Sequence, residues 1–222
     1  MKISELGEFG LIGLLASLIN KAKSPQEPSW QKLLIGIGDD TAAWQGDKAI
    51  QLATTDTMVQ DIHFNLKDTT WKELGWKSLA INLSDIAAMG GVPQYALVSL
   101  SVPGDLEVDN ISDLYEGMVD LAKEVGVAVV GGDVTNAPNI VITITIFGSL
   151  KDRSKFPLTR SSAVPGDLIA VTGYLGTSAA GLKIVTEGLT VSEETRTVLR
   201  QAHFRPTPKV KEGLELLRLG VK

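Results

Sequence analysis

The chain has 222 residues and a hydrophobic content of 44%, so it is long enough to bury one large core or two of ordinary size. Its 21 Lys and Arg against 26 Asp and Glu give a net charge of −5 without long runs of one sign, so the composition does not imply the basic face of a nucleic-acid-binding protein and disfavours that function. The chain has no cysteine, which excludes disulfides and thiolate nucleophiles. With only two histidines a zinc centre is disfavoured as well, so any metal should be bound by oxygen.

The first apolar run, Leu11 to Ile19, is too short to span a membrane. It follows the acidic residues Glu5 and Glu8, whereas a secretory signal begins with a basic segment. We therefore expect a cytoplasmic protein without a membrane partner.

Two strands are expected early in the chain, and each leads into an acidic motif. Leu33–Ile37 is followed by Gly38-Asp39-Asp40, and Ile50–Thr54 by Thr55-Asp56-Thr57. A helix is then expected from Trp71 to Met89. Asn82 and Asp85 are three residues apart in it, so their side chains should share one side of its C-terminal half.

The next elements complete a mixed α/β region over residues 33 to 148. Tyr95–Val102 alternates as a strand, and a helix capped by Asp109 or Asn110 should end at Gly126. Two further strands are expected at Val127–Val130 and Ile140–Phe147, with Gly131-Gly132-Asp133 following the first of them. The expected class is α+β with mixed strand order.

A polar segment from Lys151 to Ser162 predicts a boundary between a domain at residues 1–150 and a second one at 151–222. The second domain should begin with a strand at Asp167–Thr172. Its helices should start at a cap on Thr177 or Ser178, at a capping box formed by Thr190 with Glu193, and after Pro206 and Pro208. These elements are too few to close a core, so the chain is expected to stop within this domain.

Four motifs place an aspartate beside Gly, Ser or Thr where a strand or helix ends: Gly38-Asp39-Asp40, Thr54-Thr55-Asp56-Thr57, Asn82-Leu83-Ser84-Asp85 and Gly131-Gly132-Asp133. Carboxylates, hydroxyls and backbone groups are the oxygen donors that Mg²⁺ prefers, and clustered aspartates need cations to offset their repulsion. The pattern therefore predicts a site for magnesium and a nucleoside triphosphate.

Each feature has a structural alternative when taken alone. The first three-residue motif and the Gly-Gly-Asp motif could be turns, and Thr54-Thr55-Asp56 could be a turn or a helix cap. His63 could be an ordinary surface or core histidine. Arg160 could be a solvated charge, and Tyr115 could be an aromatic residue of the core. Only the combination favours metal and phosphate binding.

In combination these motifs closely resemble thiamine-monophosphate kinase, an ATP-dependent enzyme family in a superfamily with aminoimidazole ribonucleotide synthetase, selenophosphate synthetase and the hydrogenase maturation dehydratase. The resemblance covers nearly the whole chain and includes these further segments: Gly7-Glu8-Phe9, His63-Phe64, Leu79 to Gly91, Arg160-Ser161, Pro165-Gly166-Asp167 and Leu175 to Leu182. It implies transfer of the γ-phosphoryl group of ATP to thiamine monophosphate, giving thiamine diphosphate.

The resemblance also implies site residues, several Mg²⁺ ions and a homodimer in which the N-terminal sheets join into a barrel. By similarity the metal ligands are Asp39 with the adjacent Asp40, Thr54, Thr55, Asp56, Asp85 and Asp133. The ATP contacts are Tyr115, Gly132, Asp133 and Arg160, and His63 contacts the substrate. The family continues beyond the equivalent of Val221 with another acidic motif and with aromatic contacts for thiamine, which this sequence lacks.

Two other functions are compatible with the motifs. One is a related ATP-dependent enzyme acting on another acceptor, although the absence of cysteine disfavours the selenium and carbamoyl-transfer relatives. The other is a nucleotide-binding or dimerisation module without turnover, because the family's last motif is not present.

Overall fold

The computed structural model describes residues 33–35, 42–45, 49–152 and 154–221. Within them a sheet of six strands has the order β1-β2-β3-β6-β4-β5. Its strands are β1 (Leu33–Ile35), β2 (Ala42–Gln45), β3 (Ile50–Val59), β4 (Val92–Val102), β5 (Ala128–Asn136) and β6 (Val141–Ser149). All neighbours are antiparallel except β4 and β5, which are parallel. The mixed strand order expected from the sequence is confirmed.

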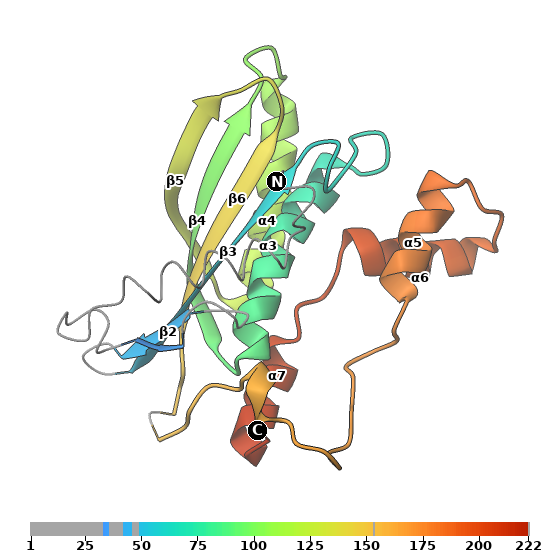
Figure 1. Ribbon diagram of the computed structural model, residues 1–222. Helices are drawn as coiled ribbons and strands as arrows, with labels where there is room; N and C mark the ends of the chain where they lie inside the picture. Colours follow the sequence, from blue (N-terminus) through green and yellow to red (C-terminus); the bar gives the residue numbers. More distant parts are fainter. Residues whose placement is uncertain (1–32, 36–41, 46–48, 153, 222) are drawn as a thin grey trace, which may run out of the picture.

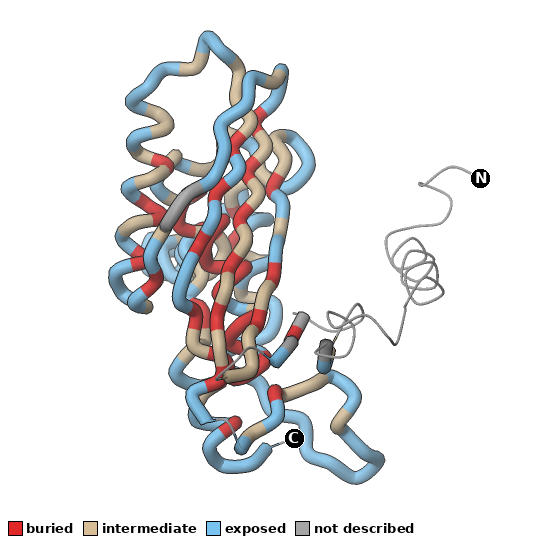
Figure 2. The backbone as a smooth tube through the Cα atoms, turned by 90° about the vertical axis from the view of Figure 1, so that its left-hand side faces the viewer, coloured by how far each residue is buried: buried red, intermediate tan, exposed pale blue. Residues whose placement is uncertain are grey.

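Two helices, α3 (Trp71–Ala88) and α4 (Val108–Val125), cover one face of this sheet (Figure 1). Successive residues of β6 point alternately to the two faces of the sheet. Ile142, Ile144 and Ile146 are buried under the helices, whereas Val141, Thr143 and Thr145 are only partly covered. Figure 2 shows the same alternation of buried and less buried residues along the strands. The sheet thus has a helix-covered face and an open face.

Glycines let the two helices approach closely. A Cβ atom at Gly75 would lie 1.8 Å from the carbonyl oxygen of Leu114, and one at Gly117 would lie 2.0 Å from that of Lys72. Such contacts are too short for any larger residue. The α3–α4 pair is therefore held in one arrangement against the sheet, and that arrangement positions the acidic end of α3.

The helix boundaries agree with the sequence only in part. Helix α3 begins after Thr70 and ends at Met89, as expected. Helix α4 ends at Gly126 in the left-handed conformation, also as expected, but its N-cap is Glu107 without a side-chain cap. The expected cap on Asp109 or Asn110 is wrong because both residues lie inside the first turn.

Strand β5 continues past Val130, so the expectation that Gly131-Gly132-Asp133 follows the strand is wrong. The strand runs to Asn136 because β4 offers pairing partners along its whole length. The register shifts between Ala96 and Leu97 of β4, where the partner changes from Val129 to Gly131. The Gly-Gly-Asp motif is thereby placed within the sheet, next to an irregularity.

The C-terminal part contains a short 3₁₀ helix, η1 (Arg160–Ser162), and the helices α5 (Thr177–Thr186), α6 (Glu193–Phe204) and α7 (Val210–Leu219). The strand expected at Asp167–Thr172 is wrong. Leu168 and Ile169 are 97% and 96% exposed, and no described strand lies beside them to accept hydrogen bonds. An apolar segment forms a β-strand only when a neighbouring strand pairs with it through backbone hydrogen bonds.

The expected caps of α5 and α6 are also wrong. Gly176 is the N-cap of α5, and the hydroxyl of Thr177 donates to Tyr174 O instead. Ser192 caps α6 by accepting a hydrogen bond from the N–H of Thr195. Thr190 lies too far before the helix to do so. The final helix, α7, is confirmed.

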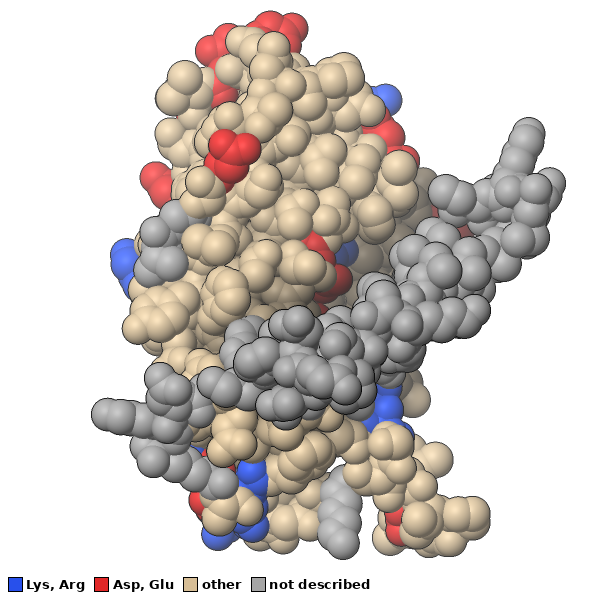
Figure 3. Space-filling model, turned by 60° about the vertical axis from the view of Figure 1, so that its left-hand side comes forward, with Lys and Arg blue, Asp and Glu red and all other residues tan. Residues whose placement is uncertain are grey.

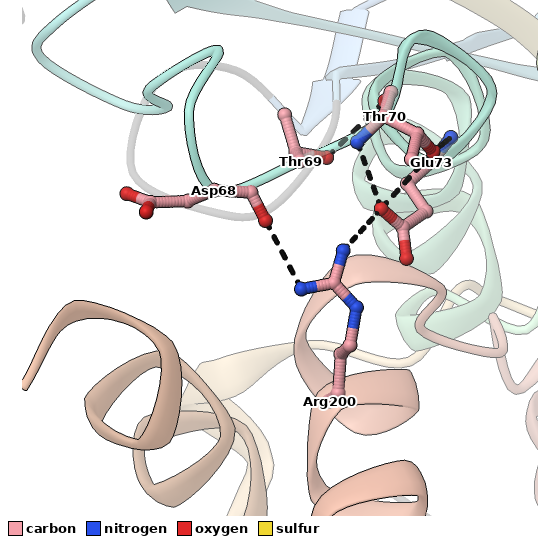
Figure 4. A network of polar contacts seen from close by, with 5 residues as sticks. All are labelled: Asp68, Thr69, Thr70, Glu73 and Arg200. Carbon is pink, nitrogen blue, oxygen red and sulfur yellow. Dashed lines mark hydrogen bonds and ion pairs between the residues drawn. The ribbon is translucent and has the colours of Figure 1, made fainter. Parts of the chain in front are cut away.

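The C-terminal helices are attached to α3 rather than to the sheet. Arg200 of α6 donates to Glu73 Oε2 at 2.7 Å and to Asp68 O at 3.1 Å (Figure 4). The carboxylate of Glu73 also completes a capping box with Thr70 at the N-terminus of α3. Glu73 therefore stabilises the start of α3 and binds α6 through Arg200. The indole N–H of Trp76 donates to Pro206 O at 2.8 Å. None of the described helices is long and apolar enough to cross a bilayer.

Candidate functional site in two groups of residues

The first group of candidate ligands lies between β3 and α3, and we call it the β3–α3 group: Thr54, Asp56 and Asp85. Thr54 Oγ1 donates to Asp85 Oδ2 at 2.7 Å. Burial raises the pKa of Asp85 to about 6, with the Thr54 hydrogen bond opposing this and the negative charge of Asp56 adding to it. Burial also raises the pKa of Asp56, while His63 lowers it. The burial of two neighbouring carboxylates is the physical cause.

Side chains along β3 point alternately to the two faces of the sheet, and this alternation decides which residues belong to the β3–α3 group. Leu52, Thr54 and Met58 are buried beneath the helices, and Asp56 has the same parity. Thr55 lies on the opposite, open face, where its hydroxyl donates to Ile144 O at 3.1 Å and lies 3.0 Å from Thr145 Oγ1. The Thr55 side chain is therefore separated by the sheet from the carboxylate of Asp85.

The second group consists of Tyr115, Gly132 and Asp133, and we call it the β5–α4 group. With Val98, Val129 and Val134 these residues line a cavity of about 410 Å³. Tyr115 is half-buried, and burial raises its pKa. The structure thus brings together three of the four residues expected to contact ATP.

Gly132 lets β5 lie close to β4 beside this cavity. A Cβ atom at this position would lie 1.8 Å from the carbonyl oxygen of Val98 on the neighbouring strand. Asp133 also lines a second hollow of about 320 Å³, which lies on the open face with Ser99, Thr143 and Thr145. Asp133 Oδ2 accepts a hydrogen bond from Thr135 at 3.0 Å, which places its carboxylate on that face.

The two groups are far apart within one chain. Asp56, Ile144, Val98 and Gly132 form one row across four neighbouring strands. At about 4.8 Å per strand, Asp56 and Gly132 are about 14 Å apart, and the carboxylates of Asp56 and Asp133 lie on opposite faces. Ligands bind Mg²⁺ at about 2.1 Å, so these two carboxylates of one chain do not share an ion. Within the described ranges no group of three or more His, Cys, Asp or Glu could hold a metal.

The remaining expected site residues are spread out. Asp39 and Asp40 lie outside the described residues. Arg160 lies in η1 with an exposed side chain and is not among the residues that line the cavities at Asp133. His63 is exposed on the turn after β3.

The donors of the β3–α3 group fit a hard cation. Two carboxylates and a hydroxyl are grouped there, and burial raises the pKa of both carboxylates. Asn82, one turn before Asp85, is fully buried, and its Oδ1 accepts no hydrogen bond from the described part of the chain. Its Nδ2 donates to Ser78 O. The oxygen donors of the β3–α3 group are of the kind that Mg²⁺ prefers.

Sequence reasoning missed the hydroxyl-bearing residues of the open face, Ser99, Thr143 and Thr145. Their signal was the strict alternation of the strand at 140–147, which put the threonines on one face. It did not reveal that β4 and β5 would place Ser99 and Asp133 beside them. That placement depends on the pairing of strands distant in sequence.

Comparison with known proteins gives a consistent assignment. The family described as AIR synthase related protein, N-terminal domain, matches residues 38–150, just over half of the chain. Thiamine-monophosphate kinase of Bacillus subtilis (strain 168) is 41% identical over 184 residues, covering 81% of this chain and 56% of that protein. Thiamine-monophosphate kinase of Aquifex aeolicus (strain VF5) is 34% identical over 210 residues, covering 95% of this chain and 63% of that protein.

Solved structures agree with these relatives. A structure described as AaThiL complexed with AMPPCP and TMP superposes with a TM-score of 0.85 at 32% identity, covering 98% of this chain and 65% of that one. A protein from Thermus thermophilus, described as tt0281, gives a TM-score of 0.81 at 28% identity, with 97% of this chain and 66% of that one covered. The chain therefore spans less than two thirds of the length of these relatives.

Proposed function

The chain belongs to the AIR synthase related protein family, and from this premise we propose that it carries the ATP- and magnesium-binding part of a thiamine-monophosphate kinase. The proposed reaction transfers the γ-phosphoryl group of ATP to the phosphate of thiamine monophosphate and yields thiamine diphosphate. The observation that carries this proposal is the β3–α3 group, in which a hydroxyl and two partly buried carboxylates meet.

The proposed chemistry asks little of the protein beyond positioning. A phosphate monoester has a second pKa of about 6, so the acceptor is largely dianionic at neutral pH and needs no strong base. Bound magnesium would supply the positive charge that lets two polyanions approach. Asp56, Asp85 and Thr54 would hold such ions, and Asp39 or Asp40 would add to them. Tyr115, Gly132 and Asp133 would bind the nucleotide, with Arg160 as a further phosphate contact.

Gly132 supports the nucleotide half of this proposal. It lines the cavity without a side chain of its own, so phosphate oxygens could approach the backbone of β5 there. Asp133 adjoins the same cavity and would hold a magnesium ion that the phosphates bring with them.

We further propose a homodimer formed through the open face of the sheet. Tyr95 and Leu97 are 51% and 37% exposed on this face. The side that Figure 3 brings forward, which carries β5 in Figure 1, is mostly uncharged, with scattered acidic groups over its upper part. In one chain the carboxylates of Asp56 and Asp133 lie on opposite faces of the sheet, and this also favours an arrangement in which a second copy contributes ligands.

Oligomeric state tests the dimer. Leu97→Glu should shift the chain to monomer in sedimentation velocity, because it would bury a charge between the two copies. Val108→Glu is the matched control, since Val108 is 76% exposed on α4 at the covered side. A monomeric wild type, or equal effects of the two variants, would contradict the dimer.

Product formation tests the activity. The chain is incubated with Mg·ATP and thiamine monophosphate, with free thiamine as the control acceptor, and thiamine diphosphate is measured by chromatography. Asp56→Asn should weaken magnesium-dependent ATP binding by about tenfold or more, whereas Asp120→Asn, on the exposed side of α4, should leave it unchanged. Equal binding by wild type and Asp56→Asn would refute the metal assignment.

We also propose a cytoplasmic location and a division into residues 1–150 and 151–222. The family match ends at residue 150, which supports the boundary.

A further inference from the structure

The helices α5 and α6 form a pair that stands apart from the sheet (Figure 1). They pack directly on each other, since a Cβ atom at Gly181 of α5 would lie 2.0 Å from the carbonyl oxygen of Leu199 of α6. Residues 163–176, which lead into α5, are all exposed. The position of the α5–α6 pair therefore depends largely on the contacts that α6 makes with α3.

One of these contacts passes through the ring of His203. Lys77 Nζ of α3 lies 2.9 Å from His203 Nε2, and Ser178 Oγ of α5 lies 3.0 Å from His203 Nδ1. A charged lysine can only donate, so Nε2 must accept, and the proton of the neutral ring lies on Nδ1, from which it is donated to Ser178. A neutral His203 thus joins all three helices by hydrogen bonds.

The charge beside this ring is positive. Among the described residues no carboxylate pairs with His203, and Lys77 is the charged group that lowers its pKa. Other charged side chains of the three helices are engaged elsewhere: Glu73 with Arg200 (Figure 4), Lys183 with Glu187, and Arg205 with the ring of Trp76. A protonated His203 would therefore have no anion to stabilise it.

Protonation would also remove the hydrogen bond to Lys77. Nε2 would then carry a proton towards an ammonium 2.9 Å away, and two cations would face each other. The place of His203 in the last turn of α6 would by itself favour the charged ring. Burial and the charge of Lys77 outweigh this and lower the pKa of His203, and burial lowers the pKa of Lys77 as well. The docked arrangement thus resists a second positive charge.

We propose that His203 forms a pH-sensitive contact: the neutral ring binds Lys77 and holds the α5–α6 pair against α3, and protonation at mildly acidic pH releases the pair. The direction follows from linkage. Because docking lowers the pKa of His203 below 6.5, the released form binds the proton more readily. Docking should therefore be strongest above that pH and weaken as the pH falls through it. This contact needs neither substrate nor metal and goes beyond the proposed function.

The pKa of His203 is directly measurable because the chain has only two histidines. In protein labelled with ¹⁵N-histidine, the ring nitrogens are followed by NMR as the pH is lowered, and His203→Gln identifies the His203 signals by their loss. We expect a pKa below 6.5. Lys77→Gln should raise it, because an amide oxygen can accept a hydrogen bond from the protonated ring. A pKa at or above 6.5 in the wild type, or no change in Lys77→Gln, would overturn the proposal.

The indole N–H of Trp76 reports docking in the same samples after ¹⁵N-tryptophan labelling. It donates to Pro206 O directly after α6, so its signal should shift when the pair leaves α3. Between about pH 7.5 and 5 the docking constant should fall by about tenfold for each unit by which docking lowers the pKa of His203. Circular dichroism should stay constant over this range, which separates release from unfolding. A Trp76 signal that does not change would overturn the proposal.

Two variants assign the response to its cause. His203→Gln keeps an acceptor for Lys77 but does not titrate, so its Trp76 signal should be independent of pH over this range. Asp85→Asn is the matched control, since Asp85 titrates near pH 6 in the same helix and its loss should leave the response unchanged. An equal response in His203→Gln, or loss of the response in Asp85→Asn, would refute the role of His203. All samples contain EDTA and no nucleotide, so failure of the kinase assay would not bear on this result.

Discussion

Replacing Asp85 with Asn should stabilise the protein in the absence of metal, although it removes a proposed ligand. Asp85 has a pKa of about 6 instead of 3.8, chiefly through burial, so folding at neutral pH carries the cost of an ionised carboxylate that is poorly solvated. The shift corresponds to an upper limit of about 3 kcal/mol, and because the group is only partly buried we expect about 1–2 kcal/mol. Asparagine keeps an oxygen that can accept the hydrogen bond of Thr54.

The pH dependence follows from the direction of the shift. Because the folded pKa is raised, the folded protein binds a proton between pH 6 and 3.8 that the unfolded chain has lost. Stability of the wild type should therefore rise as the pH falls through 6, and Asp85→Asn should lack this part of the rise. The advantage of the variant should be largest near pH 7.5 and shrink towards pH 4.5.

Urea denaturation in EDTA measures this effect through the fluorescence of Trp71 and Trp76, which lie in α3 itself. Asp120→Asn, an exposed carboxylate of α4, is the matched control and should change the unfolding free energy little. A variant at Asp85 that is less stable than wild type at pH 7.5, or a difference that does not depend on pH, would refute the reasoning. In Mg·ATP the order should reverse if Asp85 holds the ion.

Three other substitutions have definite expected outcomes. Gly132→Ala places a Cβ 1.8 Å from Val98 O and should cost about 1–3 kcal/mol with loss of ATP binding, as measured by denaturation and calorimetry. Thr70→Ala removes the capping box and should cost about 1 kcal/mol in thermal or urea unfolding. In a double-mutant cycle, Arg200→Ala and Glu73→Ala should couple by about 1–2 kcal/mol, because their 2.7 Å pair is partly buried; additive effects would mean that α6 is held by other contacts.

Local patterns in the sequence were reliable where an element is specified by its own residues. The alternation over residues 140–147 and the helical spacing that ends at Gly126 both correspond to observed elements. The acidic motifs were also found, because aspartate beside small hydroxyl or glycine residues is a local signal. Fold class and the residues of both groups at the site follow from such signals and from the family resemblance.

Elements that depend on a distant partner were predicted less well. The apolar segment at 167–172 has the composition of a strand, but no described strand pairs with it. Conversely, β5 extends through Gly131-Gly132-Asp133 because β4 pairs with it, although glycines alone suggest a turn. A strand is stabilised by its neighbour's hydrogen bonds, and the identity of that neighbour is not written in the segment itself.

By itself the sequence determined which residues have oxygen donors for magnesium and phosphate. The expectation that these residues end or follow regular elements is wrong for Asp56 and Asp133, which lie within β3 and β5. Only the tertiary structure decided their grouping. Strand β3 pairs with β6, β6 with β4 and β4 with β5, so Asp56 and Gly132 lie in one row across the sheet but about 14 Å apart. Because successive side chains of a strand point to opposite faces, the carboxylates of Asp56 and Asp133 lie on opposite faces of the sheet. The reason is that the face of the sheet on which a side chain lies depends on whether its position along the strand is odd or even. Its neighbours on that face depend instead on the order of the strands in the sheet.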